Sequence, residues 1–320
     1  MEYSAWMPDE DAQTAVIVPA RNAAATLATT LTALSDQDFS EPFEVVVVDD
    51  GSDDATATIA RDHGARVVAT KGSGPAEARN AGVSDTEAAV LAFTDADCLP
   101  RASWLRVGVE ALRGGADLAR GPILPARPPG GFDKTIHVAE PSPLFESANL
   151  FVRREIFEGA GGFERPDFVP DSVPHFGEDV LFGWRVVRNG ATVAFAEEAV
   201  VLHEVFNRGS RGYVTERLRL RLFPPLVKEA GELRETMPLG LFLSPGTARF
   251  DLAVAGILAA ARLRSPLPLL AALPYARRDL AMPPPWKLGL AGYNAARVAA
   301  DLTGLVALVW GSIRHRSPVL

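Results

Sequence analysis

Short apolar runs alternate with amphipathic segments over the first third of the chain. The runs are four to seven residues long, and the segments between them repeat apolar residues at helical spacing, as Leu27, Leu31 and Leu34 do. The strand-like runs are Ala15–Pro19, Phe43–Val48, Arg66–Ala69 and Ala88–Thr94. Because strands that alternate with helices form βαβ units, the pattern predicts an α/β, Rossmann-like fold with a mostly parallel central sheet.

Several residues suggest where the helices begin and end. Asn22 and Asp53 can cap helix N-termini, so we expect them at the starts of the first two helices. Pro75 suits the first residue of a third helix, and Pro100 precedes a fourth that ends near Gly114.

The pattern changes after residue 120. Residues 121–177 are rich in Pro and Gly and predict loops over the sheet edge, apart from a helical patch near Arg153–Glu158. Glu178–Arg188 is a predicted helix with acids in its first turn, and the strand-like runs Thr192–Phe195 and Ala199–Leu202 follow it. We therefore expect a flexible N-terminus (1–13), an α/β domain (14–210) and a helical C-terminal segment (211–320).

The composition is that of a folded protein, with 48% hydrophobic and 22% charged residues. The single cysteine, Cys98, excludes an intramolecular disulfide and any zinc site built from paired cysteines. This usage fits a reducing compartment, and residues 1–13 do not resemble a secretory signal. We expect a cytoplasmic protein.

The two ends of the chain differ in charge. The net charge is −8, yet 15 Lys and Arg stand against 7 Asp and Glu from Arg211 onward. The acidic front makes nucleic acid an unfavourable ligand, whereas the basic, apolar tail suits an anionic membrane surface as well as an ordinary solvated face. The uncharged runs of the tail, Leu252–Ala261, Ser265–Ala276 and Leu302–Ile313, are shorter than the roughly 20 residues of a spanning helix. The hypothesis is peripheral attachment to the cytoplasmic face of a membrane.

Two carboxylates follow the fourth predicted strand, in Asp95-Ala96-Asp97. An i, i+2 spacing in extended chain directs both to the same side, at the carboxyl end of a strand where open parallel sheets bind ligands. Carboxylates in that position can hold Mg²⁺ or Mn²⁺ against substrate phosphates. A role in capping the loop is the alternative.

The first two predicted strands also end in polar residues. Asp49 and Asp50 begin the run Asp-Asp-Gly-Ser-Asp, in which a carboxylate can accept hydrogen bonds from a nucleobase or ribose, while capping explains only one of the acids. The first turn, Val18–Asn22, lacks the G-x-G-x-x-G pattern. A dinucleotide-binding oxidoreductase is therefore disfavoured.

The ordered motifs VPARN, VVDDGSDD, GPAEARNAG, TDADC and GEDVLFGWRV resemble those of the family 2 inverting glycosyltransferases of GT-A fold, over residues 14–205. On the donor side, the resemblance implies that four residues contact the nucleoside, that Arg79 contacts the diphosphate, and that Asp95 and Asp97 bind the metal and ribose-phosphate, with Asp97 the direct metal ligand. The four nucleoside contacts are Pro19, Ala20, Arg21 and Asp50.

The same resemblance implies an acceptor side, bordered by Glu146–Phe151, which includes Asn149, and by the turn with Gly162 and Phe163. In the acidic pair Glu178-Asp179 it makes Asp179 the base and assigns Glu178 to the acceptor side, and it brings His203 near the metal or diphosphate. The alternatives are a packed glycine turn, acids favoured by the helix dipole, and a packed or surface histidine.

We thus expect single-sugar transfer from a nucleotide diphosphate sugar, with a UDP-sugar favoured, to an unknown acceptor hydroxyl. The hexosyltransferase-type reaction would depend on Mg²⁺ or Mn²⁺ and would serve cell-surface glycan or glycolipid synthesis. The Gln-x-x-Arg-Trp signature of processive polymerases is absent, since Trp184-Arg185 stands alone. The alternatives are a nucleotidyltransferase, disfavoured because no glycine-rich basic loop follows the first strand, and a non-catalytic binding protein on the same scaffold.

Overall fold

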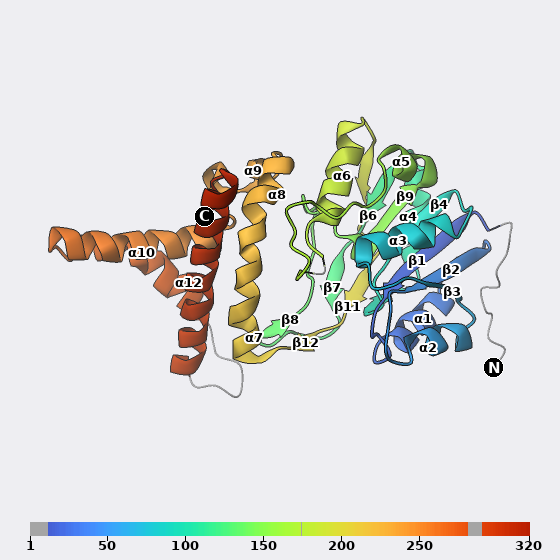
Figure 1. The fold of residues 1–320 in the computed structure, drawn as a ribbon, viewed down its shortest axis with the longest axis horizontal. Coiled ribbons are helices and arrows are strands. Elements are labelled where there is room, and N and C mark those ends of the chain that lie inside the picture. The colour runs from blue at the N-terminus through green and yellow to red at the C-terminus, as the bar shows by residue number, and fades with distance from the viewer. Residues whose placement is uncertain (1–11, 174, 281–289) are drawn as a thin grey trace. The chain divides into compact units, whose positions relative to one another are not determined.

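The computed structural model describes residues 12–173, 175–280 and 290–320, except for the side chains of 290 and 291. The chain forms two compact units (Figure 1). The sheet unit comprises the described residues up to Pro128 together with Thr135–Val205, and the helical unit comprises Pro129–Lys134 and Phe206–Leu320. The chain thus passes between the units at three points, whereas the sequence analysis places one boundary at residue 210.

A seven-stranded sheet in the order β10-β6-β9-β4-β1-β2-β3 organises the sheet unit. All its paired strands are parallel except β9, which runs antiparallel to both β4 and β6. The strands are β1 (Thr14–Ala20), β2 (Phe43–Asp49), β3 (Arg66–Ala69), β4 (Val90–Phe93), β6 (Leu118–Arg120), β9 (Leu150–Arg153) and β10 (Val193–Phe195). The predicted mostly parallel sheet is confirmed.

Alternate residues of the central strands face opposite layers of helices, as the twofold period of a strand requires. Val16 and Val18 belong to the core cluster that contains α1 and α4 side chains, whereas Ala15 and Ile17 belong to the cluster that contains α3 and α6 side chains. Gly82 of α3 lets that helix lie close on β1, because a Cβ there would come within 2.6 Å of the Ile17 side chain. The helices of this unit are α1 (Leu27–Ser35), α2 (Thr56–Asp62), α3 (Pro75–Ser84), α4 (Trp104–Arg113), the 3₁₀ turn η1 (Ser147–Asn149), α5 (Arg154–Gly159) and α6 (Glu178–Arg188).

The predicted caps at Asn22 and Asp53 are wrong. Helix α1 begins five residues after Asn22 without a side-chain cap, and Asp54, not Asp53, accepts the backbone N–H of Thr56 at the start of α2 (3.0 Å). The Asn22 backbone has a positive φ of 50°, and its side-chain oxygen accepts the N–H of Asp53 (2.9 Å). These residues join the turn after β1 to the turn after β2.

The prediction of loops for residues 121–177 is wrong in part. This stretch contributes β9 to the middle of the main sheet, with Leu150, Phe151 and Val152 fully buried. It also contributes β7 (Ile123–Pro125), which joins β5 (Cys98–Pro100) and β11 (Val201–His203) in a three-stranded sheet of order β5-β11-β7. The chain returns through these strands to the region beyond the carboxyl end of β4, which positions several residues described below.

Helices dominate the helical unit, which also holds the two-stranded sheet of β8 (Asp133–Lys134) and β12 (Phe206–Asn207). Phe132 packs against the rings of Tyr213 and Tyr293, at centroid distances of 5.3 and 5.4 Å. The helical elements are α7 (Gly209–Glu216), η2 (Arg217–Leu222), α8 (Phe223–Glu229), α9 (Leu233–Thr236), η3 (Pro238–Gly240), α10 (Pro245–Leu263), η4 (Leu267–Ala272), α11 (Leu273–Tyr275), the π turn η5 (Ala276–Leu280) and α12 (Leu290–His315).

One helix of this unit differs from the sequence expectation. Within α12, the segment Gly292–His315 contains an 18-residue window with a mean hydropathy of 1.4, so it is long and apolar enough to cross a membrane, by length and composition alone. This segment is longer than the uncharged run Leu302–Ile313 because it includes the charged residues Arg297 and Asp301. Both are hydrogen-bonded within the unit: Arg297 donates to Asp279 (3.0 Å), and Asp301 accepts from Tyr275 (2.7 Å).

Candidate active site

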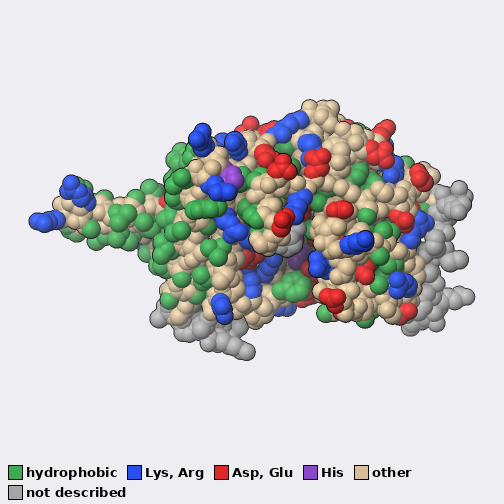
Figure 2. Space-filling view, in the orientation of Figure 1, with side chains coloured by type: hydrophobic (Ala, Val, Ile, Leu, Met, Phe, Trp, Pro, Cys, Tyr) green, Lys and Arg blue, Asp and Glu red, His purple; other side chains and the backbone are tan. Residues whose placement is uncertain are grey.

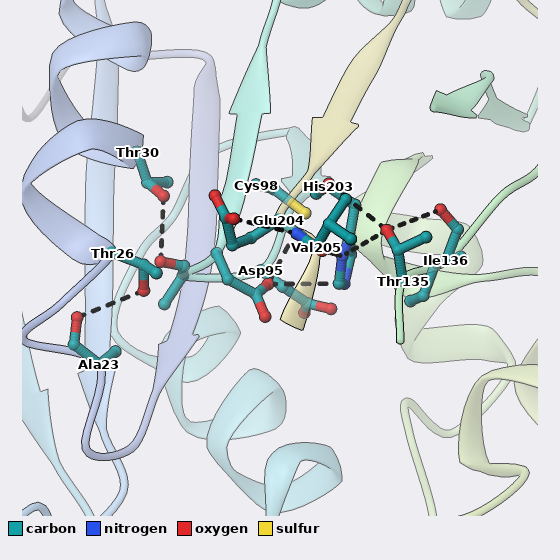
Figure 3. Close-up of polar contacts among 12 residues, drawn as sticks. Ala23, Thr26, Thr30, Asp95, Cys98, Thr135, Ile136, His203, Glu204 and Val205 are labelled. Carbon is teal, nitrogen blue, oxygen red and sulfur yellow. Dashed lines mark hydrogen bonds and ion pairs between the residues drawn. The ribbon is translucent and has the colours of Figure 1, made fainter. Parts of the chain in front are cut away.

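The two carboxylates of Asp95-Ala96-Asp97 lie just beyond the carboxyl end of β4. The turn is fixed to α1, since the Thr30 hydroxyl donates to the Ala96 carbonyl (3.0 Å; Figure 3). The side chains of Asp95 and Asp97 are 27% and 28% exposed, so both are supported by the protein and still open to a ligand.

Arg79 of α3 contacts Asp95 and holds it in place. Its Nη2 donates to Asp95 Oδ1 at 2.7 Å, and the residue is only 4% exposed. Burial by itself lowers the pKa of Arg79, but the charges of Asp95, Glu178 and Asp179 outweigh it and raise that pKa. Arg79 is therefore a buried counter-ion of the acids, with little surface left for the diphosphate contact that the resemblance implies.

His203 lies beside Asp97 because β11 pairs with β5, where His203 is in register with Cys98. Its Nδ1 is 2.7 Å from the Glu204 carbonyl oxygen and 3.3 Å from the Thr135 hydroxyl (Figure 3). A carbonyl oxygen only accepts, so Nδ1 carries the proton of the neutral ring and Nε2 presents a lone pair. That Nε2 is 3.7 Å from Asp97 Oδ1.

These groups fit a divalent cation. Asp97, Cys98 and His203 offer ligand atoms that all lie within 4.8 Å of one another. Burial, reinforced by the two neighbouring aspartates, raises the pKa of the Cys98 thiol well above its usual value, so the protonated sulfur is a poor ligand. The carboxylate of Asp97 and the oriented imidazole of His203 remain, an oxygen and a nitrogen donor suited to Mg²⁺ or Mn²⁺, and Asp95 lies two residues away in contact with Arg79.

Asp50 organises the loop that leads into α3. The residue is 4% exposed, and its carboxylate accepts the hydroxyl of Thr70 (2.6 Å) and the backbone N–H groups of Ser73 and Gly74 (2.9 Å each). Charge-assisted hydrogen bonds of this kind hold a loop firmly. The sequence analysis missed Thr70 and Ser73, since nothing in their local pattern marks them as partners of an acid 20 and 23 residues away.

The other residues predicted for the nucleoside lie at the same edge. Pro19 and Ala20 end β1, and the exposed Arg21 follows them. Gly72 has a positive φ of 79°, and a Cβ there would come within 3.2 Å of Arg21 Nη1, so Arg21 lies over the loop that Asp50 fixes. The structure thus brings Pro19, Ala20, Arg21 and Asp50 together.

Asp179 lies in the first turn of α6 and is surrounded by other acids. Its Oδ2 accepts a long hydrogen bond from the Ser147 N–H (3.4 Å). Burial, together with the charges of Glu178 and Glu146, raises the pKa of Asp179 to about 8, and Arg79 only partly opposes this shift. In its ionised form, a carboxylate with so high a pKa is a strong proton acceptor.

The segment that carries Glu146 is held tightly against α6. Phe145 has a positive φ of 53°, which is rare for a bulky residue. Its ring lies under the Arg120 guanidinium (4.5 Å) and beside Trp184 (5.5 Å), and a Cβ at Gly183 would overlap it. Glu146 itself was not singled out from the sequence as an influence on Asp179.

A cavity of about 320 Å³ opens beside these acids. Phe163 and Glu178 line it, and Gly162, with a φ of 66°, forms the turn that precedes Phe163. The side chain of Asn80 pairs with the backbone N–H and carbonyl of Phe163 (3.0 and 2.7 Å). The residues around the cavity are Ser73, Pro75, Ala76, Glu77, Asn80, Phe163, Arg165, His175 and Glu178.

Asn149 does not border this cavity. It is 1% exposed; its side-chain oxygen accepts the Trp104 indole N–H (2.8 Å), and its nitrogen donates to the carbonyls of Pro122 (2.9 Å) and Ala199 (2.7 Å). This amide joins three segments of the core. The structure does not support the acceptor contact predicted for it.

The sequence profile of the family described as "Glycosyl transferase family 2" matches residues 15–192. This match covers more than half of the chain and the site described above except for His203 and Glu204, which lie beyond residue 192. The protein belongs to glycosyl transferase family 2. It is therefore a glycosyltransferase, and the nucleotidyltransferase and non-catalytic alternatives are set aside.

Named relatives agree with this family. Glycosyltransferase AglE of Haloferax volcanii is 31% identical over 206 residues, which cover 59% of this chain and 66% of AglE. The pre-mycofactocin glycosyltransferase of Mycobacterium tuberculosis is 27% identical over 225 residues, which cover 59% of this chain and 42% of the relative. The chain spans less than two thirds of the length of either relative.

Solved structures share the fold. The mannosyltransferase PcManGT from Pyrobaculum calidifontis, in complex with GDP-Man and Mn²⁺, superposes with a TM-score of 0.55 at 21% identity, over 95% of this chain and 90% of that one. S. aureus TarS 1-349, in complex with UDP-GlcNAc, gives 0.51 at 19% identity, over 95% and 92%. These likenesses confirm the predicted GT-A fold.

Proposed function

We propose that this glycosyltransferase moves a single sugar from a nucleotide diphosphate sugar to an acceptor hydroxyl, with inversion at the anomeric carbon. A UDP-sugar is the favoured donor, in line with the UDP-GlcNAc bound to TarS. Because PcManGT binds GDP-Man, GDP-sugars should be tested as donors as well. The proposed setting is cell-surface glycan or glycolipid synthesis on the cytoplasmic side of a membrane.

The observation that carries the proposal is the pairing of Asp97 with His203 beside the carboxyl end of β4, where Asp95 also lies, with Asp179 as a separate, half-buried acid. Asp97 and His203 offer ligand atoms within 4.8 Å of each other, and Asp179 has a raised pKa that makes its ionised form a strong proton acceptor. Two kinds of acid, one for a cation and one for a proton, are what an inverting transfer requires.

Asp97 and His203, supported by Asp95, are the residues that would hold Mg²⁺ or Mn²⁺. A divalent cation bound there stabilises the negative charge of a departing nucleoside diphosphate. The Mn²⁺ in the complex of PcManGT is consistent with this choice. Arg79 keeps Asp95 in place, and the Glu204 carbonyl keeps the His203 ring oriented.

Asp179 is the proposed base. As the acceptor oxygen forms its bond to the anomeric carbon, its proton passes to the Asp179 carboxylate, and the bond from that carbon to the diphosphate oxygen breaks with its electron pair. Displacement in one step inverts the configuration and needs no covalent enzyme intermediate. Glu178 and Phe163 line the neighbouring cavity, which we assign to the acceptor, with Gly162 shaping its turn.

A panel of nucleotide sugars tests this proposal. Release of nucleoside diphosphate should occur with one donor class, require Mn²⁺ or Mg²⁺, and stop with a chelator. NMR of the first-formed product should show an anomeric configuration opposite to that of the donor. Metal-independent release would refute the cation site, and a product of retained configuration would refute the role of Asp179.

A further inference from the structure

Large apolar side chains are exposed on one unit only. Every exposed large hydrophobic residue in the described part of the chain belongs to the helical unit, and most lie on α10, η4, α11 and α12. We call these the apolar face; its members are Leu252, Ile257, Leu258, Leu263, Leu267, Leu269, Leu270, Leu273, Val298, Leu302, Val306, Val309, Trp310 and Ile313. Apolar surface that is this extensive and contiguous along helices marks an interaction site.

Helix α12 places its large and small residues on opposite sides. Val298, Leu302, Val306, Val309 and Ile313 recur at intervals of three and four residues and form one exposed stripe. The opposite side is small, with Gly304 close to Leu220 and Gly311 against the backbone of Arg221. Only 28% of the 18-residue apolar window of α12 is buried, whereas a core helix of a water-soluble protein would be mostly buried.

The acidic groups of these helices are turned inward. Asp279 is 4% exposed and accepts hydrogen bonds from Arg249 of α10 (2.7 and 3.1 Å) and from Arg297 of α12 (3.0 Å). Asp301 accepts the Tyr275 hydroxyl (2.7 Å). Acids paired in the interior and large apolar side chains on the surface are an arrangement that a hydrocarbon solvent favours.

The exposed charges of this region are of one sign. Among the described residues from Pro238 to the C-terminus, every exposed charged side chain is an arginine, while Asp251, Asp279 and Asp301 are partly or fully buried. The exposed arginines are Arg262, Arg264, Arg277, Arg278, Arg314 and Arg316. A second copy of the chain would bring like charges together, whereas anionic headgroups complement them. Figure 2 shows hydrophobic side chains along α10 with Lys and Arg side chains at its end.

We propose that the apolar face enters an anionic lipid bilayer, with the exposed arginines at the headgroups. The sequence alone suggests peripheral, charge-driven attachment; the structure points to insertion, in which apolar burial dominates and charge adds selectivity. Salt screens the charge contribution and leaves the apolar contribution intact, so the two modes differ in their response to salt.

Flotation of the full-length protein with vesicles tests insertion. Protein transferred from detergent to phosphatidylcholine vesicles, with or without phosphatidylglycerol, should float with both, more strongly with phosphatidylglycerol, and should stay bound in high salt. The double variant Leu258→Glu, Val306→Glu changes two positions that are 65% and 61% exposed, and should lower vesicle binding at least about tenfold. Thr29→Glu, at an exposed position of α1, is the control and should float like the wild type.

Arg277→Gln with Arg278→Gln should reduce the preference for phosphatidylglycerol and leave binding to phosphatidylcholine unchanged. Circular dichroism and thermal unfolding check that each variant is folded. The proposal is overturned if the wild type does not float, if high salt releases it completely, or if the glutamate variant binds as well as the wild type. It is also overturned if the wild type forms a detergent-free dimer that the glutamate variant dissociates, because a second copy would then cover the apolar face.

Discussion

The acids around Asp179 predict an unusual pH dependence of sugar transfer. Because the pKa of Asp179 is raised to about 8, only about a tenth of the molecules carry the ionised base at pH 7. The rate should therefore rise about tenfold between pH 7 and the plateau above pH 8, instead of levelling off near pH 5 as for an ordinary aspartate. The assay is kcat/KM for release of nucleoside diphosphate at saturating Mn²⁺, measured across this range.

Two substitutions locate the origin of that pH dependence. Glu178→Gln removes a negative charge that raises the pKa of Asp179, so the rise in rate should move to lower pH. Glu77→Gln removes a carboxylate that lines the same cavity without contributing to this shift, and should leave the pH profile of the rate unchanged.

Asp179→Asn cannot accept a proton, so turnover should fall by roughly 10² to 10⁴ while donor binding persists.

The same raised pKa predicts a change in stability. The folded chain retains a proton on Asp179 that the unfolded chain releases above about pH 3.9, so stability is lost as the pH rises from there toward about 8. Asp179→Asn should accordingly raise Tm at pH 7 and have little effect at pH 4. A near wild-type rate in Asp179→Asn, or an unmoved profile in Glu178→Gln, would refute the assignment of the base, and Glu178 would be the next candidate in the first case.

The remaining predictions concern the donor side and the fold. Asp97→Ala should abolish the part of donor binding that depends on Mn²⁺; calorimetry with Mn²⁺ and with chelator measures it, and an unchanged metal dependence would place the cation elsewhere. Asp50→Ala should weaken nucleoside diphosphate binding by about 1 to 3 kcal/mol, because the loop before α3 loses its buried acceptor; Asp53→Ala, at an exposed position, is the control, and equal affinities would contradict the argument. Gly183→Ala should cost about 1 to 3 kcal/mol of unfolding free energy, since the added Cβ overlaps the Phe145 ring, and a Tm equal to that of the wild type would show that the ring can move.

Elements with strong local patterns could be predicted from the sequence. β3 and α6 begin and end at the predicted residues Arg66–Ala69 and Glu178–Arg188. β9 could not, because Leu150–Arg153 runs directly into the helical turn of α5 and its partners β4 and β6 lie far away along the chain. A short apolar run of this kind does not distinguish a strand from a buried helix until its neighbours are known.

The site was predictable where motifs mark it and not where distant residues complete it. Asp95 and Asp97 follow a recognisable strand, but Thr135 contacts His203 across 68 residues and no local pattern identifies it. Asn149 shows the reverse error. Its segment resembles one that borders acceptor pockets. In the folded chain, however, its side-chain amide is hydrogen-bonded to core residues that lie far away in the sequence.

Arg79 explains how neighbouring acids can serve different purposes. Its guanidinium is buried, and it gives a hydrogen bond to Asp95 at 2.7 Å but acts on Asp179 only through its charge. Asp95 is thereby held in place by a permanent cation. At Asp179, burial and the charges of Glu178 and Glu146 outweigh the same cation, so that acid keeps a high pKa. Environments that treat nearby acids unequally allow one to support cation binding while another exchanges a proton; here Asp95 has a direct contact with Arg79, whereas burial dominates at Asp179.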